Sequence, residues 1–96
     1  MRSRYSAYAL GKSDYIMRTT HVDSPHRQHD IAAWRASLDA FSRHTQFEGL
    51  SIVAADTNTV TFHAILSQDG RDTSFIENSV FRQEDGQWRY VTAQGE

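Results

Sequence analysis

The stretch Val60-Thr61-Phe62-His63-Ala64-Ile65-Leu66 carries the pattern that decides the fold. Side chains of a β-strand point alternately to two faces, so a half-buried strand has an apolar residue at every second position. Val60, Phe62, Ala64 and Leu66 keep this period of two. The same period is found in three further segments: Leu50, Ile52 and Ala54; Phe75, Glu77, Ser79 and Phe81; Trp88 and Tyr90. The second half of the chain therefore predicts four strands.

Short turn sequences separate these segments. They are Asp56-Thr57-Asn58, Asp69-Gly70 and Asp85-Gly86, in which Gly or Asn can adopt a positive φ. Connections this short join antiparallel neighbours. The four strands are thus expected to form one antiparallel sheet.

The first half of the chain has the spacing of helices instead. Tyr5, Tyr8 and Ala9 recur at helical intervals, and Gly11 is placed to end that first helix. A second short helix is predicted to begin with Ser13 as its cap and to end near His21.

A third helix is predicted from Ser24-Pro25, an N-cap residue followed by proline at the first helical position. Its buried stripe is expected to be Ile31, Trp34, Leu38 and Phe41. Three helices followed by four strands is an α+β order. The simplest packing lays the helices across one face of a curved antiparallel sheet.

Length and composition restrict the class of protein. The 96 residues suit a single domain, 1–96, and the net charge of -2 gives no broad positive surface for nucleic acid. The chain has no cysteine, hence no disulfide and no thiolate zinc site, and no window is apolar enough for a signal peptide or membrane span. We expect a cytoplasmic protein without membrane contact.

Several segments resemble the middle domain of the YchJ family. They are the opening Met1-Arg2-Ser3-Arg4-Tyr5-Ser6-Ala7-Tyr8, the strand Glu77-x-Ser79-x-Phe81 and the strand Gly86-x-Trp88-x-Tyr90. The resemblance implies a cone like that of nuclear transport factor 2, in which helices and a bent sheet enclose a pocket. Many members of the family carry a cysteine-rich SEC-C zinc segment, which is not found in these 96 residues. The resemblance implies a fold and no particular reaction, and it leaves open a stand-alone form or a fragment of a longer protein.

Glu77 and Ser79 are the polar residues of most interest. The period of two puts them on the same inward strand face as Phe75 and Phe81. An inward carboxylate either acts in a pocket, as a general base or ligand anchor, or forms a structural ion pair. We expect an ion pair between Glu77 and Arg4 of the first helix.

Aromatic residues are the candidates for a pocket wall. Tyr5, Tyr8, Trp34, Phe62 and Trp88 could line a ligand cavity, although they could equally form an ordinary core. Tyr15 is a further candidate polar residue of the pocket.

The histidines give no convincing metal site. His21, His26 and His29 lie close in sequence, but a loop with Pro25 separates the first from the others. Their spacing favours surface histidines over metal ligands. We expect neither a metal nor a cofactor.

The leading functional hypothesis is a non-catalytic binding or adaptor domain for an unknown protein or small molecule. The alternative, which the resemblance to such cones implies, is a small cofactor-free enzyme of isomerase, dehydratase or hydrolase type that uses Glu77 and Tyr15. A third possibility is a structural homodimer that pairs through the outer sheet face, where the following residues are expected: Thr61, His63, Ile65, Asn78 and Val80.

Overall fold

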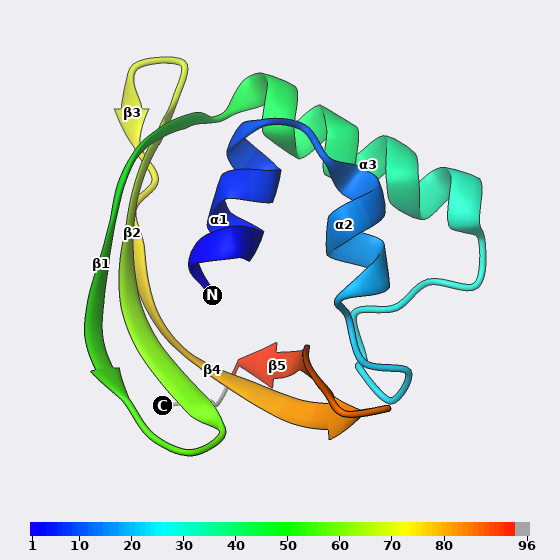
Figure 1. Ribbon diagram of the computed structural model, residues 1–96. Helices are drawn as coiled ribbons and strands as arrows, with labels where there is room; N and C mark the ends of the chain where they lie inside the picture. The colour runs from blue at the N-terminus through cyan, green and yellow to red at the C-terminus, as the bar shows by residue number, and fades with distance from the viewer. Residues whose placement is uncertain (94–96) are drawn as a thin grey trace.

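The computed structural model describes residues 1–93, in which three helices precede five strands (Figure 1). The helices are α1 (Arg2–Ala9), α2 (Ser13–Arg18) and α3 (Ile31–His44). The strands are β1 (Gln46–Ala55), β2 (Thr59–Gln68), β3 (Arg71–Asp72), β4 (Phe75–Glu84) and β5 (Gln87–Ala93). This order confirms the predicted α+β class.

The strands form one antiparallel sheet in the order β1-β2-β4-β5. The register places Phe62 opposite Glu77 and Ala64 opposite Phe75, so the predicted inward residues of β2 and β4 share one face. Phe62, Ala64 and Leu66 are buried at the centre of that face. Tyr5 of α1 and Phe47 of β1 pack against them.

The sheet has one strand more than predicted. After the Asp69-Gly70 turn, the two residues of β3 pair with the end of β2. The pairing is then interrupted at Ser74, whose Oγ accepts a hydrogen bond of 3.0 Å from the backbone N–H of Leu66. Regular pairing resumes at Phe75. A side chain that replaces a backbone partner thus divides one predicted strand into β3 and β4.

Two predicted turns have the backbone that their sequences require. Asp69 and Gly70 have φ of 52° and 77°, and Asp85 and Gly86 have φ of 55° and 79°. Positive φ at both central residues matches the right-handed twist of the flanking strands. These turns fix the register of the strands on either side.

The sheet bends around α1, while α3 crosses one end of the cone (Figure 1). Register shifts interrupt the β1–β2 pairing near Phe47 and Ile52, and another interrupts the β4–β5 pairing at Val80. Such bulges increase the local twist and bend a strand. The bend leaves the concave face only partly covered by α1 and α3.

Helix α3 begins later than predicted. Its first residue is Ile31, and Asp30 is the N-cap, with a side-chain oxygen 3.0 Å from the backbone N of Ala33. Ser24 does not cap a helix, because its buried hydroxyl donates to the carbonyl oxygen of Val91 in β5. The predicted start at Ser24-Pro25 is therefore wrong.

The stripe of α3 is also less buried than predicted. Trp34 is 4% exposed, whereas Ile31 and Phe41 are 48% and 38% exposed. Only the middle of the helix is fully covered by neighbouring elements.

The ends of α2 differ from the sequence prediction in two ways. Lys12 is the N-cap residue, and Ser13 is the first helical residue and buried. The helix ends at Arg18, and the chain then pairs with β5 through an isolated parallel bridge between Thr20 and Tyr90. The backbone N of His21 lies 2.7 Å from the carbonyl oxygen of Tyr90. This bridge attaches the helical half to the last strand.

No helix within residues 1–93 is long and apolar enough to cross a membrane.

Candidate functional site

A cavity of about 440 Å³ lies between α1, α3 and the concave face of the sheet. Four of the predicted wall residues line it: Tyr5, Tyr8, Trp34 and Phe62. Sequence reasoning did not assign Phe47 of β1 or Gln28 of the loop before α3 to this wall. The exposed flank of α3 contributes Ser37, Leu38 and Phe41. The helical spacing of Leu38 and Phe41 is visible in the sequence, but the same spacing is typical of a plain core.

Aromatic rings from three elements contact one another around the cavity. Phe41 of α3 meets Tyr8 of α1 edge to face at 5.6 Å and Phe47 of β1 at 5.9 Å. Phe47 in turn meets Tyr5 at 5.6 Å. Aromatic pairs favour this geometry. These contacts connect α1, α3 and β1 at the wall of the cavity.

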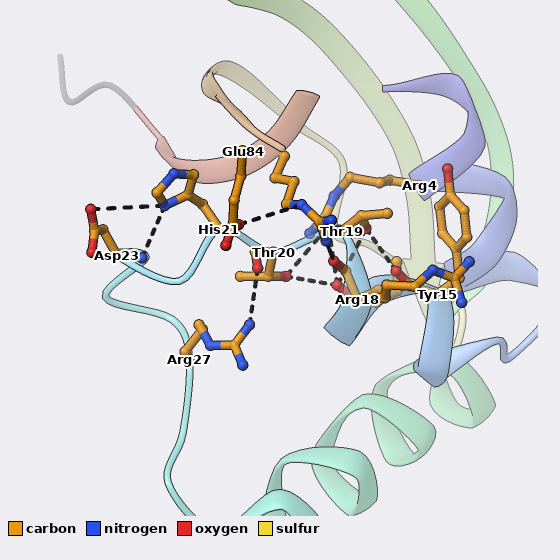
Figure 2. Close-up of polar contacts among 11 residues, drawn as sticks. Arg4, Tyr15, Arg18, Thr19, Thr20, His21, Asp23, Arg27 and Glu84 are labelled. Carbon is orange, nitrogen blue, oxygen red and sulfur yellow. Dashed lines mark hydrogen bonds and ion pairs between the residues drawn. The ribbon is translucent and has the colours of Figure 1, made fainter. Parts of the chain in front are cut away.

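Arg4 lines one end of the cavity, which we call the polar end, and most of its side chain is buried. It is 7% exposed, and its Nη1 donates to Thr19 Oγ1 at 2.7 Å and to the Ile16 carbonyl oxygen at 3.3 Å (Figure 2). Its guanidinium carbon lies 4.7 Å from the ring centroid of Tyr90. Burial lowers the pKa of Arg4, but an arginine keeps its charge at neutral pH. A cation therefore lies at the wall.

Glu77 is the acidic group of the same region. Its Oε2 accepts a hydrogen bond of 2.6 Å from Ser79 Oγ and lies 3.5 Å from the hydroxyl of Tyr90. Glu77 lines the cavity. Ser79 is completely buried and does not line it. Ser79 thus positions the carboxylate from behind the wall.

The predicted ion pair between Arg4 and Glu77 is wrong, since no ion pair of residues 1–93 joins them. Arg4 is directed to the end of α2, where a carbonyl oxygen and two threonine hydroxyls accept its N–H groups. Tyr90 contacts both groups, Arg4 through its ring and Glu77 through its hydroxyl. Thr19 and Thr20 could not be identified as partners because their approach depends on the bridge to β5.

Two tyrosine hydroxyls at this end of the cavity stay protonated over a wide pH range. Burial raises the pKa of Tyr90, and the nearby Glu77 carboxylate raises it further. Burial also raises the pKa of Tyr8, with Arg4 opposing the change and Glu77 adding to it. At neutral pH both hydroxyls are hydrogen-bond donors.

Tyr15 and Trp88 do not line this cavity. They lie at a second hollow of about 320 Å³, beside the β1–β2 turn at Asp56. The Tyr15 hydroxyl donates to Ser3 Oγ at 2.7 Å, and Trp88 is 47% exposed. Trp88 pairs with Gln83 near the last hairpin turn, beyond the part of the sheet that the helices cover. The alternation of side chains predicts the correct sheet face for Trp88, but it does not show how far along the strand the helices cover that face.

The three clustered histidines have different roles. His21 is buried, contrary to the surface expectation, and its Nδ1 accepts a hydrogen bond of 3.0 Å from the backbone N–H of Asp23. His26 is exposed, lines the cavity and lies 5.8 Å from the Tyr90 ring. His29 is exposed. Within residues 1–93, no three histidine, aspartate or glutamate side chains gather as metal ligands would.

Comparison with known proteins identifies the family. A family model described as "YchJ, middle NTF2-like domain" matches residues 1–93. The solution structure of a SEC-C motif containing protein from Rhodopseudomonas palustris superposes with a TM-score of 0.75 at 28% identity. The match covers 100% of this chain and 75% of that one. The helices-then-sheet cone and the family match agree, and the chain belongs to the family of YchJ middle NTF2-like domains.

Proposed function

We propose that this domain is a non-catalytic binding domain that holds a small, mainly apolar molecule in the cavity between α1, α3 and the sheet. The observation that carries the proposal is the open space of about 440 Å³ with aromatic walls and a polar end. Ligand sites in proteins are usually concave, mainly apolar and equipped with a few placed polar groups. A plain core would instead be filled to crystal-like density.

The geometry gives less support to an enzyme. The two residues expected to act together, Glu77 and Tyr15, line different hollows. The groups next to the Glu77 carboxylate are Ser79 and Tyr90, and the raised pKa of Tyr90 keeps its hydroxyl from acting as a base. A binding role needs only the cavity and its polar end.

The likeness to a SEC-C motif containing protein is the reason to retain an adaptor role beside ligand binding. In such a role the bound molecule would stabilise the cone while another surface meets a partner. A chain without cysteine has no need of an oxidising compartment, so we place this function in the cytoplasm.

The test is the binding of N-phenylnaphthylamine, a neutral apolar dye that fluoresces when it leaves water. We expect saturable binding to the parent protein and its loss in Ser37→Phe, because Ser37 lines the cavity and a phenyl ring would occupy the opening. The matched control is Ala36→Phe, which adds the same ring to an exposed neighbouring position outside the cavity wall.

Circular dichroism establishes that both variants fold. Equal loss of dye binding in the two variants, or no saturable binding to the parent, would overturn the proposal.

A further inference from the structure

The polar end of the cavity contains one positive and one negative group that do not neutralise each other directly. Arg4 and Glu77 both line the space, and no ion pair joins them. Each contacts a different part of Tyr90, the guanidinium at the ring face and the carboxylate at the hydroxyl. A ligand head in this region therefore meets both charges.

The hydrogen-bonding capacity that faces the cavity is equally mixed. The hydrogen bonds that Glu77 accepts from Ser79 and Tyr90 both go to Oε2, so within residues 1–93 the other carboxylate oxygen, Oε1, has capacity for a ligand donor. The hydrogen bonds that Arg4 donates to Ile16, Thr19 and Thr20 come from Nη1, and the protonated hydroxyl of Tyr8 lies beside the guanidinium. One side of the polar end accepts and the other donates.

We propose that the ligand of this cavity is an apolar, aromatic-sized molecule with an uncharged head that both donates and accepts hydrogen bonds, as a primary carboxamide does. This inference rests on the proposed function. The carboxamide N–H would donate to Glu77, and its oxygen would accept from Arg4 or Tyr8.

Charged heads fit the same site less well. A carboxylate could pair with Arg4, but it would lie close to the Glu77 carboxylate, which would repel it. An ammonium group could pair with Glu77, but it would meet the buried guanidinium of Arg4. The body of the ligand is expected to be a flat ring system, because the rings of Tyr5, Tyr8 and Phe41 can contact its edges and faces.

The experiment compares three probes with one naphthalene body: naphthalene carboxamide, naphthalene carboxylate and naphthylmethylamine. Their dissociation constants are measured at neutral pH by ligand-observed NMR titration. We expect the carboxamide to bind at least about tenfold more tightly than either charged probe.

Substitution of Glu77 tests whether this carboxylate selects the polar head group of the ligand. In Glu77→Gln the negative charge is removed at nearly constant shape, so the carboxylate should gain about tenfold relative to the carboxamide. The matched control is Glu48→Gln, an exposed position outside the cavity wall, which should leave the ratios of the three dissociation constants unchanged.

The outcomes separate this inference from the proposed function. If the carboxylate or the amine binds tightest, if the three probes bind equally, or if Glu77→Gln leaves the ratio of the carboxylate and carboxamide dissociation constants unchanged, the uncharged-head inference is overturned while ligand binding stands. If N-phenylnaphthylamine shows no saturable binding to the parent protein, the proposed function fails, and this inference fails with it.

Discussion

Arg4 joins three elements through one side chain. It starts in α1, donates to oxygens at the end of α2 and lies against the ring of Tyr90 in β5. Removing a charge from water costs free energy unless good hydrogen bonds replace its hydration. Three oxygen acceptors and an aromatic face supply that replacement here.

Substitution of Arg4 tests this role. Arg4→Met should lower the free energy of unfolding by about 3 kcal/mol, because hydrogen bonds from a charged donor are lost and buried acceptors lose their partner. Glu77→Gln should cost less than about 1 kcal/mol, since no ion pair is broken. Both values are measured by urea unfolding.

The double variant is the control for an ion pair. Without direct contact, the two losses should add to within about 0.5 kcal/mol. A coupling energy above about 1.5 kcal/mol would contradict the separation of Arg4 from Glu77.

Trp34 is the second residue that single substitution can test. It is the one buried residue of α3, and the guanidinium of Arg27 lies 5.3 Å from its ring. Trp34→Ala should lower the free energy of unfolding by about 3–5 kcal/mol, as deletion of a buried aromatic side chain does. Ile31→Ala, at a half-exposed position of the same helix, should cost under about 1 kcal/mol in the same urea titration. Equal losses would show that Trp34 does not anchor the helix.

At the scale of elements, the start of α3 shows where sequence patterns are ambiguous. Both Ser24 and Asp30 are good N-cap residues, and Pro25 suits a first helical position. Ser24 is unavailable as a cap because its hydroxyl donates a hydrogen bond to the carbonyl oxygen of Val91 in β5. That acceptor is distant in sequence and gives no local signal.

Removal of the cap tests the start of α3 directly. Asp30→Ala should lower the free energy of unfolding by about 1 kcal/mol, because the N–H of Ala33 loses its acceptor. Asp39→Ala, which removes the same charge from the middle of the same helix, should change it by less than about 0.5 kcal/mol. The comparison uses thermal unfolding followed by circular dichroism. An unaffected Asp30→Ala would contradict the cap.

Strands and turns were predictable because their signals are local. The alternation from Val60 to Leu66 and the Asp-Gly turns determine the sheet without reference to the rest of the chain. The division at Ser74, the bridge from Thr20 to Tyr90 and the partners of Arg4 all depend on groups brought together by folding. The wall of the cavity was predicted in part for the same reason, since periodicity shows which face is inward but not how much of it is covered.

At the scale of the whole molecule, the bent sheet creates the cavity and thereby lowers the stability of the folded state. Bulges curve the sheet around α1, and the concave face is wider than α1 and α3 can fill. Space without protein atoms loses van der Waals contacts, so an open cavity reduces stability. A molecule bound there restores contacts and stabilises the folded state by mass action.

The buried tyrosines at the polar end make the stability of the cone sensitive to alkaline pH. Burial and the Glu77 carboxylate raise the pKa of Tyr90 in the folded state above the value of about 10 that it has in an unfolded chain. Below that pH both states hold the proton and stability is unaffected. Above it the unfolded state releases the proton while the folded state keeps it, so the free energy of unfolding falls as pH rises.

Substitution of Tyr90 tests this dependence. Between about pH 10 and 11, the free energy of unfolding of Tyr90→Phe should fall less steeply with pH than that of the parent, by up to about 1 kcal/mol per pH unit. The difference is smaller than a fully buried group would give, because water screens the half-buried ring. The measurement is urea unfolding of parent and variant at a series of alkaline pH values, and identical slopes would contradict a raised pKa at Tyr90.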